Sequence, residues 1–286
     1  MLQTIIFRSL KPDVYSDLII PVIDSSPTQP LELRDITGLE PVTSTINSKG
    51  YGEQDGEFYI GGHTPKRNIV MKFGLNASGG PSSVSAARNL CYGYMMTKSK
   101  VQLRFITDDH VPVEITGYVE SLTPDRFTED PGMQVSIICP KPNFLADQVE
   151  VRGESGIDPD LVYIFYNGNR ETGIQFALDG ADEDYVGRII LETYLVDNTR
   201  YQFFMTYNDL YLSSFWQFWL STMQGDKRLD ARTSETDIVQ NLLPKMDPDS
   251  WWMTLVPGRN GFRVRTPSSD TPRGWWLRYS EQYGGI

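Results

Sequence analysis

Histidine, the side chain that most often does acid–base work near neutral pH, is scarce in this sequence. Only two histidines occur among 286 residues: His63 in a glycine-rich stretch and His110 in a tight turn. Neither stands in a nucleophile motif or a metal-ligand motif. A serine or cysteine nucleophile needs a base held at a fixed position. The sequence therefore predicts no catalytic residue, and we expect that this protein is not an enzyme.

Acidic side chains are numerous, and their densest group could present oxygen ligands to Ca²⁺. The group comprises Asp179, Asp182, Glu183 and Asp184. Its spacing lacks the regular pattern of a calcium-binding loop, and paired carboxylates do acid–base chemistry only in a cleft that separates their pKa values. We interpret the group as a solvated turn and predict no metal ion and no cofactor.

The two cysteines, Cys91 and Cys139, are too few for a disulfide framework, and no CxxC pattern accompanies them. Two buried free thiols in a protein made in the cytoplasm are the favoured interpretation. A single bridge between them is the alternative.

Tryptophan supplies the remaining candidate chemistry, because an indole ring can stack on the face of a sugar. All six tryptophans lie in the second half of the chain. Trp216 and Trp219 belong to an apolar run that would mark a partner-binding or glycan-binding surface wherever it is exposed. Packing in a core or against another subunit is the competing interpretation, since indoles most often fill the interior of a β-sandwich.

Length and composition are those of an ordinary globular protein with room for two domains. At about 150 residues per domain, 286 residues suggest two, and 40% of the residues are apolar. No apolar run approaches the roughly 20 residues that span a bilayer, and no basic stretch precedes the short apolar run at the start. We expect a soluble protein with no membrane insertion and no signal peptide.

The charge balance argues against nucleic-acid binding. The chain has 26 basic and 37 acidic residues, a formal net charge of −11. Affinity for DNA or RNA depends on neutralising phosphates with Lys and Arg. We therefore expect no sequence-specific nucleic-acid binding.

Alternation of apolar and polar residues with period two dominates the first half and predicts antiparallel strands. The candidate strands are residues 2–7, 18–23, 69–75, 101–105, 111–119 and 133–139. One helix interrupts them, because Val84, Ala87 and Cys91 recur at helical spacing after the capping stretch that begins at Pro81. We predict this helix over about 82–96.

Between residues 47 and 65 the chain becomes polar and rich in glycine, with an Asp-Gly pair typical of a turn. One interpretation is a surface hairpin, and the other is an arm that becomes ordered only against another subunit. The stretch is rich in backbone donors and poor in apolar anchors, so as an arm it would pair as strands with its neighbour. Its subunit-interface residues would be Gly52, Asp55, Gly56, Phe58, Tyr59 and Ile60.

Two prolines, Pro140 and Pro142, end the last strand of the first half and suggest a domain boundary. We expect residues 140–147 to be a linker between a domain over 1–147 and a second domain over 148–286. The second part has short aromatic and β-branched runs at a spacing of roughly 10 residues, which favours an antiparallel sandwich or a partly open barrel. These runs are residues 162–166, 173–178, 188–194 and 201–205.

A set of short motifs occurs in a fixed order along most of the chain. In the first half these are the arm at 51–59, the strand at 67–73, and the stretches 117–120 and 134–144. In the second half they are the stretches 166–168, 225–230, 252–262 and 279–286. Together they resemble the distal tail (Dit) proteins of long-tailed bacteriophages. Lys141 departs from that family's pattern, which often has an acidic residue there.

The resemblance implies a mainly β fold: an N-terminal β-sandwich with one helix, like that of tail-tube proteins, and a C-terminal galectin-like β-sandwich. It also implies a structural virion protein, assembled in the host cytoplasm and located at the phage tail tip. Six copies would form a homo-hexamer ring that joins the tail tube protein to the tail-tip hub or baseplate. DNA would pass through the ring, and receptor-binding or side-fibre proteins would dock on it.

Two alternatives accompany this interpretation. Six chains at −11 carry about −66, which would repel DNA from the wall of the ring, but acidity also serves simply to keep the free protein soluble. The alternative function is a carbohydrate-binding adhesion module of the tail tip that contacts the host surface, and it depends on the tryptophans.

Overall fold

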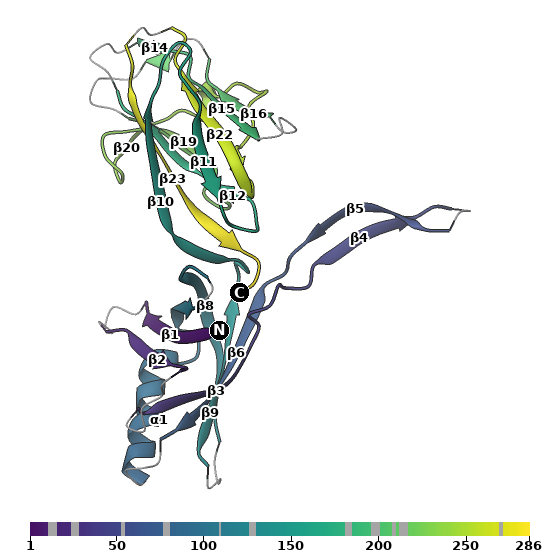
Figure 1. The fold of residues 1–286 in the computed structure, drawn as a ribbon, viewed down its shortest axis with the longest axis vertical. Helices are drawn as coiled ribbons and strands as arrows, with labels where there is room; N and C mark the ends of the chain where they lie inside the picture. The colour runs from purple at the N-terminus through teal and green to yellow at the C-terminus, as the bar shows by residue number, and fades with distance from the viewer. Residues whose placement is uncertain are drawn as a thin grey trace. The chain divides into compact units, whose positions relative to one another are not determined.

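The structure is a computed structural model that describes residues 1–10, 16–23, 29–52, 55–76, 81–108, 110–125, 130–180, 185–195, 201–207, 210–211, 217–268 and 271–286. These residues form two compact units. The first comprises Met1–Asp147 and Tyr283–Ile286, and the second comprises Gln148–Gln282. Strands dominate both units (Figure 1), which confirms the mainly β fold class predicted from the sequence.

The strands of the first unit form two antiparallel sheets that share the long strand β8. One sheet has the order β2-β1-β7-β8-β10, and the other continues as β8-β9-β6-β3. The first half of β8 pairs with β7 and β10, and its second half pairs with β9. The bounds are β1 Leu2–Ser9, β2 Leu18–Pro21, β3 Leu31–Thr37, β6 Arg67–Leu75, β7 Lys100–Thr107, β8 Val113–Pro124, β9 Gly132–Cys139 and β10 Phe144–Glu154.

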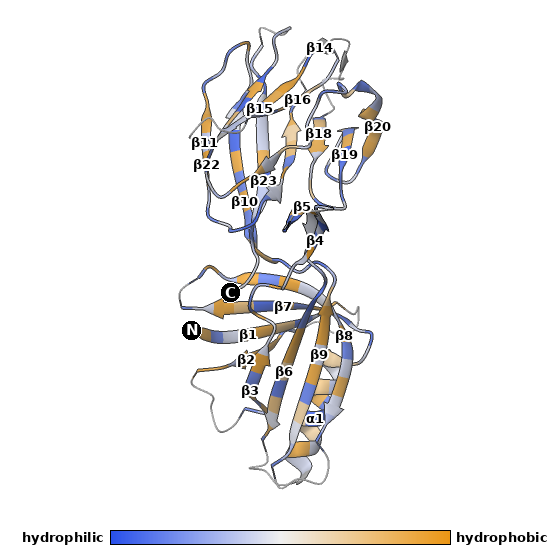
Figure 2. Cartoon of the chain, turned by 90° about the vertical axis from the view of Figure 1, so that its right-hand side faces the viewer, coloured by the Kyte–Doolittle hydropathy of each residue, from blue (hydrophilic) through white to orange (hydrophobic). Residues whose placement is uncertain are grey.

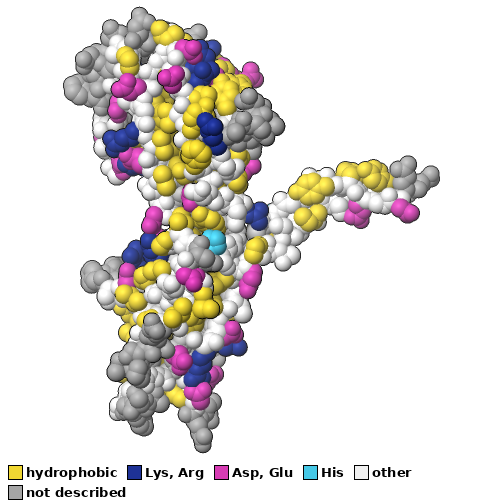
Figure 3. Space-filling model, in the orientation of Figure 1, with side chains coloured by type: hydrophobic (Ala, Val, Ile, Leu, Met, Phe, Trp, Pro, Cys, Tyr) yellow, Lys and Arg dark blue, Asp and Glu magenta, His cyan; other side chains and the backbone are white. Residues whose placement is uncertain are grey.

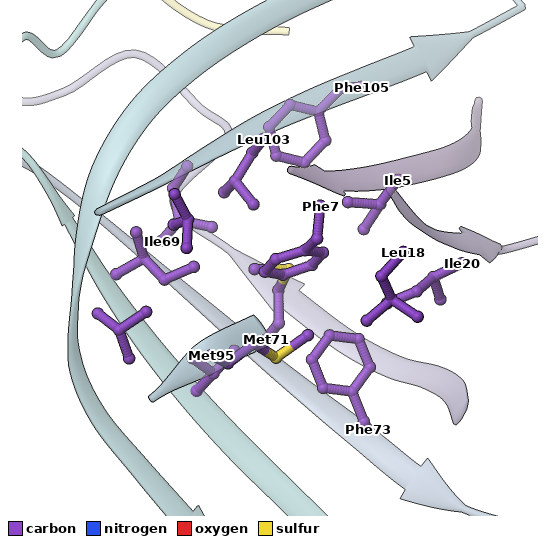
Figure 4. Packing of buried hydrophobic residues seen from close by; sticks show 14 of the residues in the cluster. Ile5, Phe7, Leu18, Ile20, Ile69, Met71, Phe73, Met95, Leu103 and Phe105 are labelled. Atoms are coloured by element: carbon purple, nitrogen blue, oxygen red, sulfur yellow. The ribbon is translucent and has the colours of Figure 1, made fainter. Parts of the chain in front are cut away.

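Alternate residues of β1, β2, β6, β7, β8 and β9 build most of the core of the first unit, as the period-two alternation predicted. Figure 2 shows the alternating hydropathy along the strands, and Figure 4 shows the buried side chains meeting between them. Phe7 of β1 meets Phe73 of β6 edge-on, with ring centroids 6.3 Å apart. Each sheet thus buries one face against the other.

The helix α1 closes this core. It spans Pro81–Met95, one residue earlier at each end than the expected range of about 82–96. It contacts β1, β6 and β8. Pro81 occupies the first turn, where its missing N–H costs no hydrogen bond. Ala87, Cys91 and Met95 lie four residues apart on one face of the helix and are buried.

Both cysteines are free and buried, so the structure contains thiols rather than a bridge. Burial raises the pKa of Cys91 to about 12 and the pKa of Cys139 to about 11. Because the thiolate is the reactive form, the folded protein should not react with a thiol reagent at about pH 8, and it should react at both cysteines once unfolded in guanidinium. Rapid release of thionitrobenzoate from the native protein, followed by absorbance, would contradict this expectation.

Arg67, at the start of β6, is buried and joins three separate segments of the first unit. Its side chain is 1% exposed, and burial lowers its pKa. The guanidinium donates to four backbone carbonyl oxygens, those of Pro142 at 2.6 Å, Glu40 at 2.7 Å, Gly38 and Gly284. The five N–H donors of a guanidinium, in a rigid fork, suit such a convergence of acceptors.

Residues 140–147, expected as a linker, instead complete the first core. β10 begins at Phe144, whose ring is fully buried and lies 5.7 Å from the ring of Phe105 and 4.4 Å from the guanidinium carbon of Arg67. Leu145 and Ala146 then pair with β8. Pro140 and Pro142 follow the end of β9 as predicted. Burying a phenylalanine contributes about 1.5–3 kcal/mol, and this stabilises the pairing of the following residues with the sheet.

The last four residues also differ from the expectation, which placed 148–286 in one domain. Tyr283–Ile286 belong to the first unit. They are held there because Arg67 binds the Gly284 carbonyl and the Ile286 N–H donates to the carbonyl oxygen of Leu39 at 3.1 Å. The first unit is therefore discontinuous in sequence.

The second unit is a sandwich of two antiparallel sheets with the orders β10-β23-β13-β18-β19-β20 and β11-β22-β15-β16. Phe176 of the first sheet meets Phe262 of the other at 6.0 Å between ring centroids, and Trp275 packs against both. Two short strand pairs, β12-β21 and β14-β17, complete it. The bounds are β11 Val162–Tyr166, β12 Thr172–Gly173, β13 Gln175–Leu178, β14 Tyr185–Gly187, β15 Ile190–Leu195, β16 Tyr201–Met205, β17 Leu210–Tyr211, β18 Gln217–Ser221, β19 Arg228–Arg232, β20 Ile238–Asn241, the 3-10 helix η1 Leu243–Lys245, β21 Thr254–Leu255, β22 Gly258–Arg265 and β23 Gly274–Tyr283.

Candidate assembly surface

The strands β4 (Thr45–Gly50) and β5 (Glu57–His63) form a hairpin that stands apart from the sheets of the first unit (Figure 1). In the described part of the chain these two strands pair only with each other. Every residue of β4 is exposed, and in β5 only Gly61 is half-buried. An isolated two-stranded hairpin is at best marginally stable in water, so this one would gain stability from a partner.

A glycine makes the turn of this hairpin possible. Gly56 has φ +106°, a conformation that L side chains rarely adopt, and its carbonyl accepts a hydrogen bond from the Tyr51 N–H at 3.5 Å. Asp55 beside it and Gly52 are exposed. The Asp-Gly pair therefore lies directly before β5 in the connection between the two strands, and it leaves an acidic side chain near the hairpin tip.

The hairpin exposes large apolar side chains, which corrects the expectation that it is poor in apolar anchors. Figure 3 shows them along its length. Their exposed fractions are 67% for Tyr59, 61% for Ile46, 60% for Ile60, 51% for Tyr51 and 42% for Phe58. Apolar groups gathered on one protruding element are typical of an interaction surface.

These side chains occupy both faces of the hairpin. Phe58 lies opposite Lys49 in the strand register and packs against Tyr51 at 5.6 Å between ring centroids. Tyr59 lies opposite Ser48, and Ile46 lies opposite Gly62, on the other face. The predicted interface residues included 58–60 but not Ile46 or Tyr51. A single apolar residue among glycine and polar neighbours gives no periodic pattern that would indicate its role.

Neither histidine belongs to a chemical cluster. His63 ends β5 and is exposed, and His110 is exposed with its ring 6.3 Å from the ring of Tyr283. No group of three or more His, Cys, Asp or Glu residues that could hold a metal ion occurs in the described ranges. Of the acidic group at 179–184, Asp179 accepts a hydrogen bond from Gln217 at 2.7 Å, and residues 182–184 lie outside the described residues.

Trp219 does not present a free aromatic face. It is 6% exposed, it meets Trp276 edge-on at 4.6 Å, and the guanidinium carbon of Arg232 lies 4.6 Å from its ring centroid. An indole enclosed in this way cannot stack on a sugar ring, so its environment is that of the core-packing interpretation. Trp216, the other candidate, lies outside the described residues.

In the described parts of the chain, no helix is both long and apolar enough to cross a membrane.

No protein-family model matches the sequence, and no curated protein matches it. Solved structures do match. The Dit (gp 19.1) protein of SPP1, described as a paradigm of the hub adsorption apparatus in phages that infect Gram-positive bacteria, has a TM-score of 0.62 at 12% identity. That match covers 90% of this chain and 95% of the SPP1 chain.

Two structures of the phage P2 baseplate in its activated conformation also match, each with a TM-score of 0.47. The one with Ca is 11% identical and covers 100% of both chains, and the one with Sr is 10% identical and covers 99% of both. The match to SPP1 Dit is the stronger of these, and it includes most of each unit. The chain therefore has the fold of the SPP1 Dit hub protein, which confirms the Dit-type fold that the sequence motifs implied.

Proposed function

We propose that this chain is a structural protein of a phage tail, a distal tail protein that forms a hexameric ring between the tail tube and the tail tip or baseplate. The observation that carries this function is the Dit fold over 90% of the chain, with a protruding apolar hairpin on its first unit. The sequence motifs point the same way.

Ring closure explains why such a protein carries an arm. A closed ring needs heterologous contacts, in which one face of a subunit meets a different face of the next. The hairpin offers two unpaired strand edges and exposed side chains, including Phe58, Tyr59 and Ile60. Gly52, Asp55 and Gly56 place the tip of the hairpin against the neighbouring subunit.

The rest of the function follows from the ring. One side of the homo-hexamer meets the tail tube protein, and the other meets the tail-tip hub. The second unit serves as a docking site for receptor-binding or side-fibre proteins. DNA passes through the ring without sequence-specific contacts, and the assembly acts without catalysis.

The test is the oligomeric state of the purified full chain, measured by sedimentation velocity and by negative-stain microscopy. We expect a six-fold ring, or two such rings stacked, with six or twelve times the mass of one chain. A monomer at concentrations of tens of micromolar would contradict the ring. A monomer that also binds glycans on an array would favour the adhesion module instead.

A further inference from the structure

A pocket of about 360 Å³ lies on the first unit, on the face of β7 and β8 that points away from the core. Lys100 and Gln102 line it from β7, at positions that alternate with the buried Val101 and Leu103. The turn after β9 supplies another wall, which includes Lys141.

The pocket carries a surplus of positive charge. Lys100 and Lys141 are exposed and form no ion pair with the described residues. Glu114, the carboxylate of the lining, pairs with Arg104 at 2.8 Å and accepts a hydrogen bond from Gln102, and Arg104 also pairs with Asp147 at 2.8 Å, which is not part of the lining. The lining itself therefore has two lysines and one carboxylate. This surplus, on a chain with a net charge of −11, favours an anionic group.

The rim of the pocket also has apolar surface. Tyr118 and Leu145 line it and are exposed. The occupant that fits is therefore a segment in which carboxylates stand next to apolar side chains, because such a segment satisfies the lysines and covers the rim together.

The hairpin tip of this chain is such a segment. Asp55 and Glu57 are exposed there, and Phe58 follows directly. Glu57 also accepts a hydrogen bond from Ser48, which holds it across the hairpin. The six residues of β4 span about 20 Å at a rise of about 3.3 Å per residue, so the tip is carried well beyond the base of the hairpin.

We propose that the Lys100–Lys141 pocket receives the acidic hairpin tip, with Asp55 and Glu57, from a neighbouring copy of this chain. This inference rests on the proposed ring and names the surface that receives the arm. Each copy carries one tip and one pocket on different parts of its first unit, so every copy gives one contact and accepts one. That is the arrangement a closed heterologous ring requires.

Charge reversal tests the contact. The variant K100E/K141E should keep its circular dichroism spectrum, because both side chains are exposed. Its ring should dissociate at concentrations at which the wild-type ring is still intact, because attraction becomes repulsion. The dissociation constant of the ring should rise about tenfold or more. The wild-type ring should also weaken as NaCl is raised, because salt screens exposed charges.

A charge swap separates this contact from an effect of net charge. The variant D55K/E57K should weaken the ring in the same way, and combining it with K100E/K141E should restore both the ring and the net charge of −11. In the matched control, D55K/E57K is combined with K72E/K227E, which reverses two lysines outside the pocket lining. This control has the same net charge and should not regain the ring.

Sedimentation velocity gives outcomes that distinguish this inference from the proposed function. If K100E/K141E forms a ring as stable as that of the wild type, the pocket contact is overturned and the proposed ring remains. The same follows if the K72E/K227E control regains the ring. A variant that keeps its ring but loses binding to another tail protein would show that the pocket serves that protein instead. A wild type that forms no ring would overturn both proposals.

Discussion

Replacing Arg67 by methionine is expected to unfold the first unit at a temperature where the second unit remains folded. The change leaves four carbonyl oxygens, including those of Pro142 and Gly284, without their donor in a buried site. Unsatisfied buried groups cost about 1–3 kcal/mol each, and losing one partner of a buried charged network costs about 3–5 kcal/mol. A loss of that size is a large part of the stability of a typical domain.

Two probes can follow the two units separately. All six tryptophans lie in the second unit, between residues 216 and 276, so their fluorescence reports its unfolding alone. Amide hydrogen exchange of peptides from β6 and β9 reports the first unit. In R67M we expect fast exchange in β6 and β9 and an unchanged tryptophan transition.

Arg8 provides the matched control, because it pairs with Asp17 at 2.9 Å on the surface. Exposed ion pairs contribute about 0–1 kcal/mol, so R8M should exchange like the wild type. R67K, which keeps the charge and loses the planar fork, should be destabilised in the same unit and remain folded enough to measure. Equal exchange in R67M and R8M would show that the carbonyl network is not important for stability.

Removing the hairpin is expected to have the second large effect, the loss of the ring with both units still folded. Deleting residues 49–62 and bridging the gap with a short glycine linker removes none of the buried residues of either core. Burying three large apolar side chains contributes several kcal/mol to a contact, so the dissociation constant should rise more than about 100-fold. Sedimentation velocity over a dilution series measures this change.

A variant with Phe58, Tyr59 and Ile60 replaced by serine should dissociate in the same way without any change of chain length. Its control is F165S, which removes a phenylalanine that is also exposed but lies on β11 of the second unit. A deletion variant that forms the same ring with the same resistance to dilution would mean that the hairpin is an ordinary surface element and plays no part in assembly.

The strands and the helix were predictable because their signals are local. Alternation at 69–75 and 133–139 became the paired strands β6 and β9, and the four-residue spacing of Ala87 and Cys91 became the buried face of α1. The strand β3 was missed, because only Leu31 is buried in it and its burial pattern has no regular alternation.

The errors concern residues whose environment is made by distant parts of the chain. The prolines at 140 and 142 indicated a linker, but Phe144 is buried by Phe105 and Arg67. The tryptophan run left a surface role and core packing both open, and Trp219 is covered by Trp276 and Arg232. Neither outcome depends on neighbours in sequence, so no local pattern could have indicated it.

The β class, the position of the helix, the Asp-Gly pair between the two hairpin strands and the Dit-type fold were all predictable without a structure, because they depend on side-chain periodicity, backbone conformation and ordered motifs. Three features appear only in the folded protein: the return of Tyr283–Ile286 to the first unit, the burial of the Arg67 guanidinium and the pocket that Lys100 and Lys141 both line. These features bring together residues that lie far apart in the chain. Burial and charge act through space, so their effects appear only once the chain has folded.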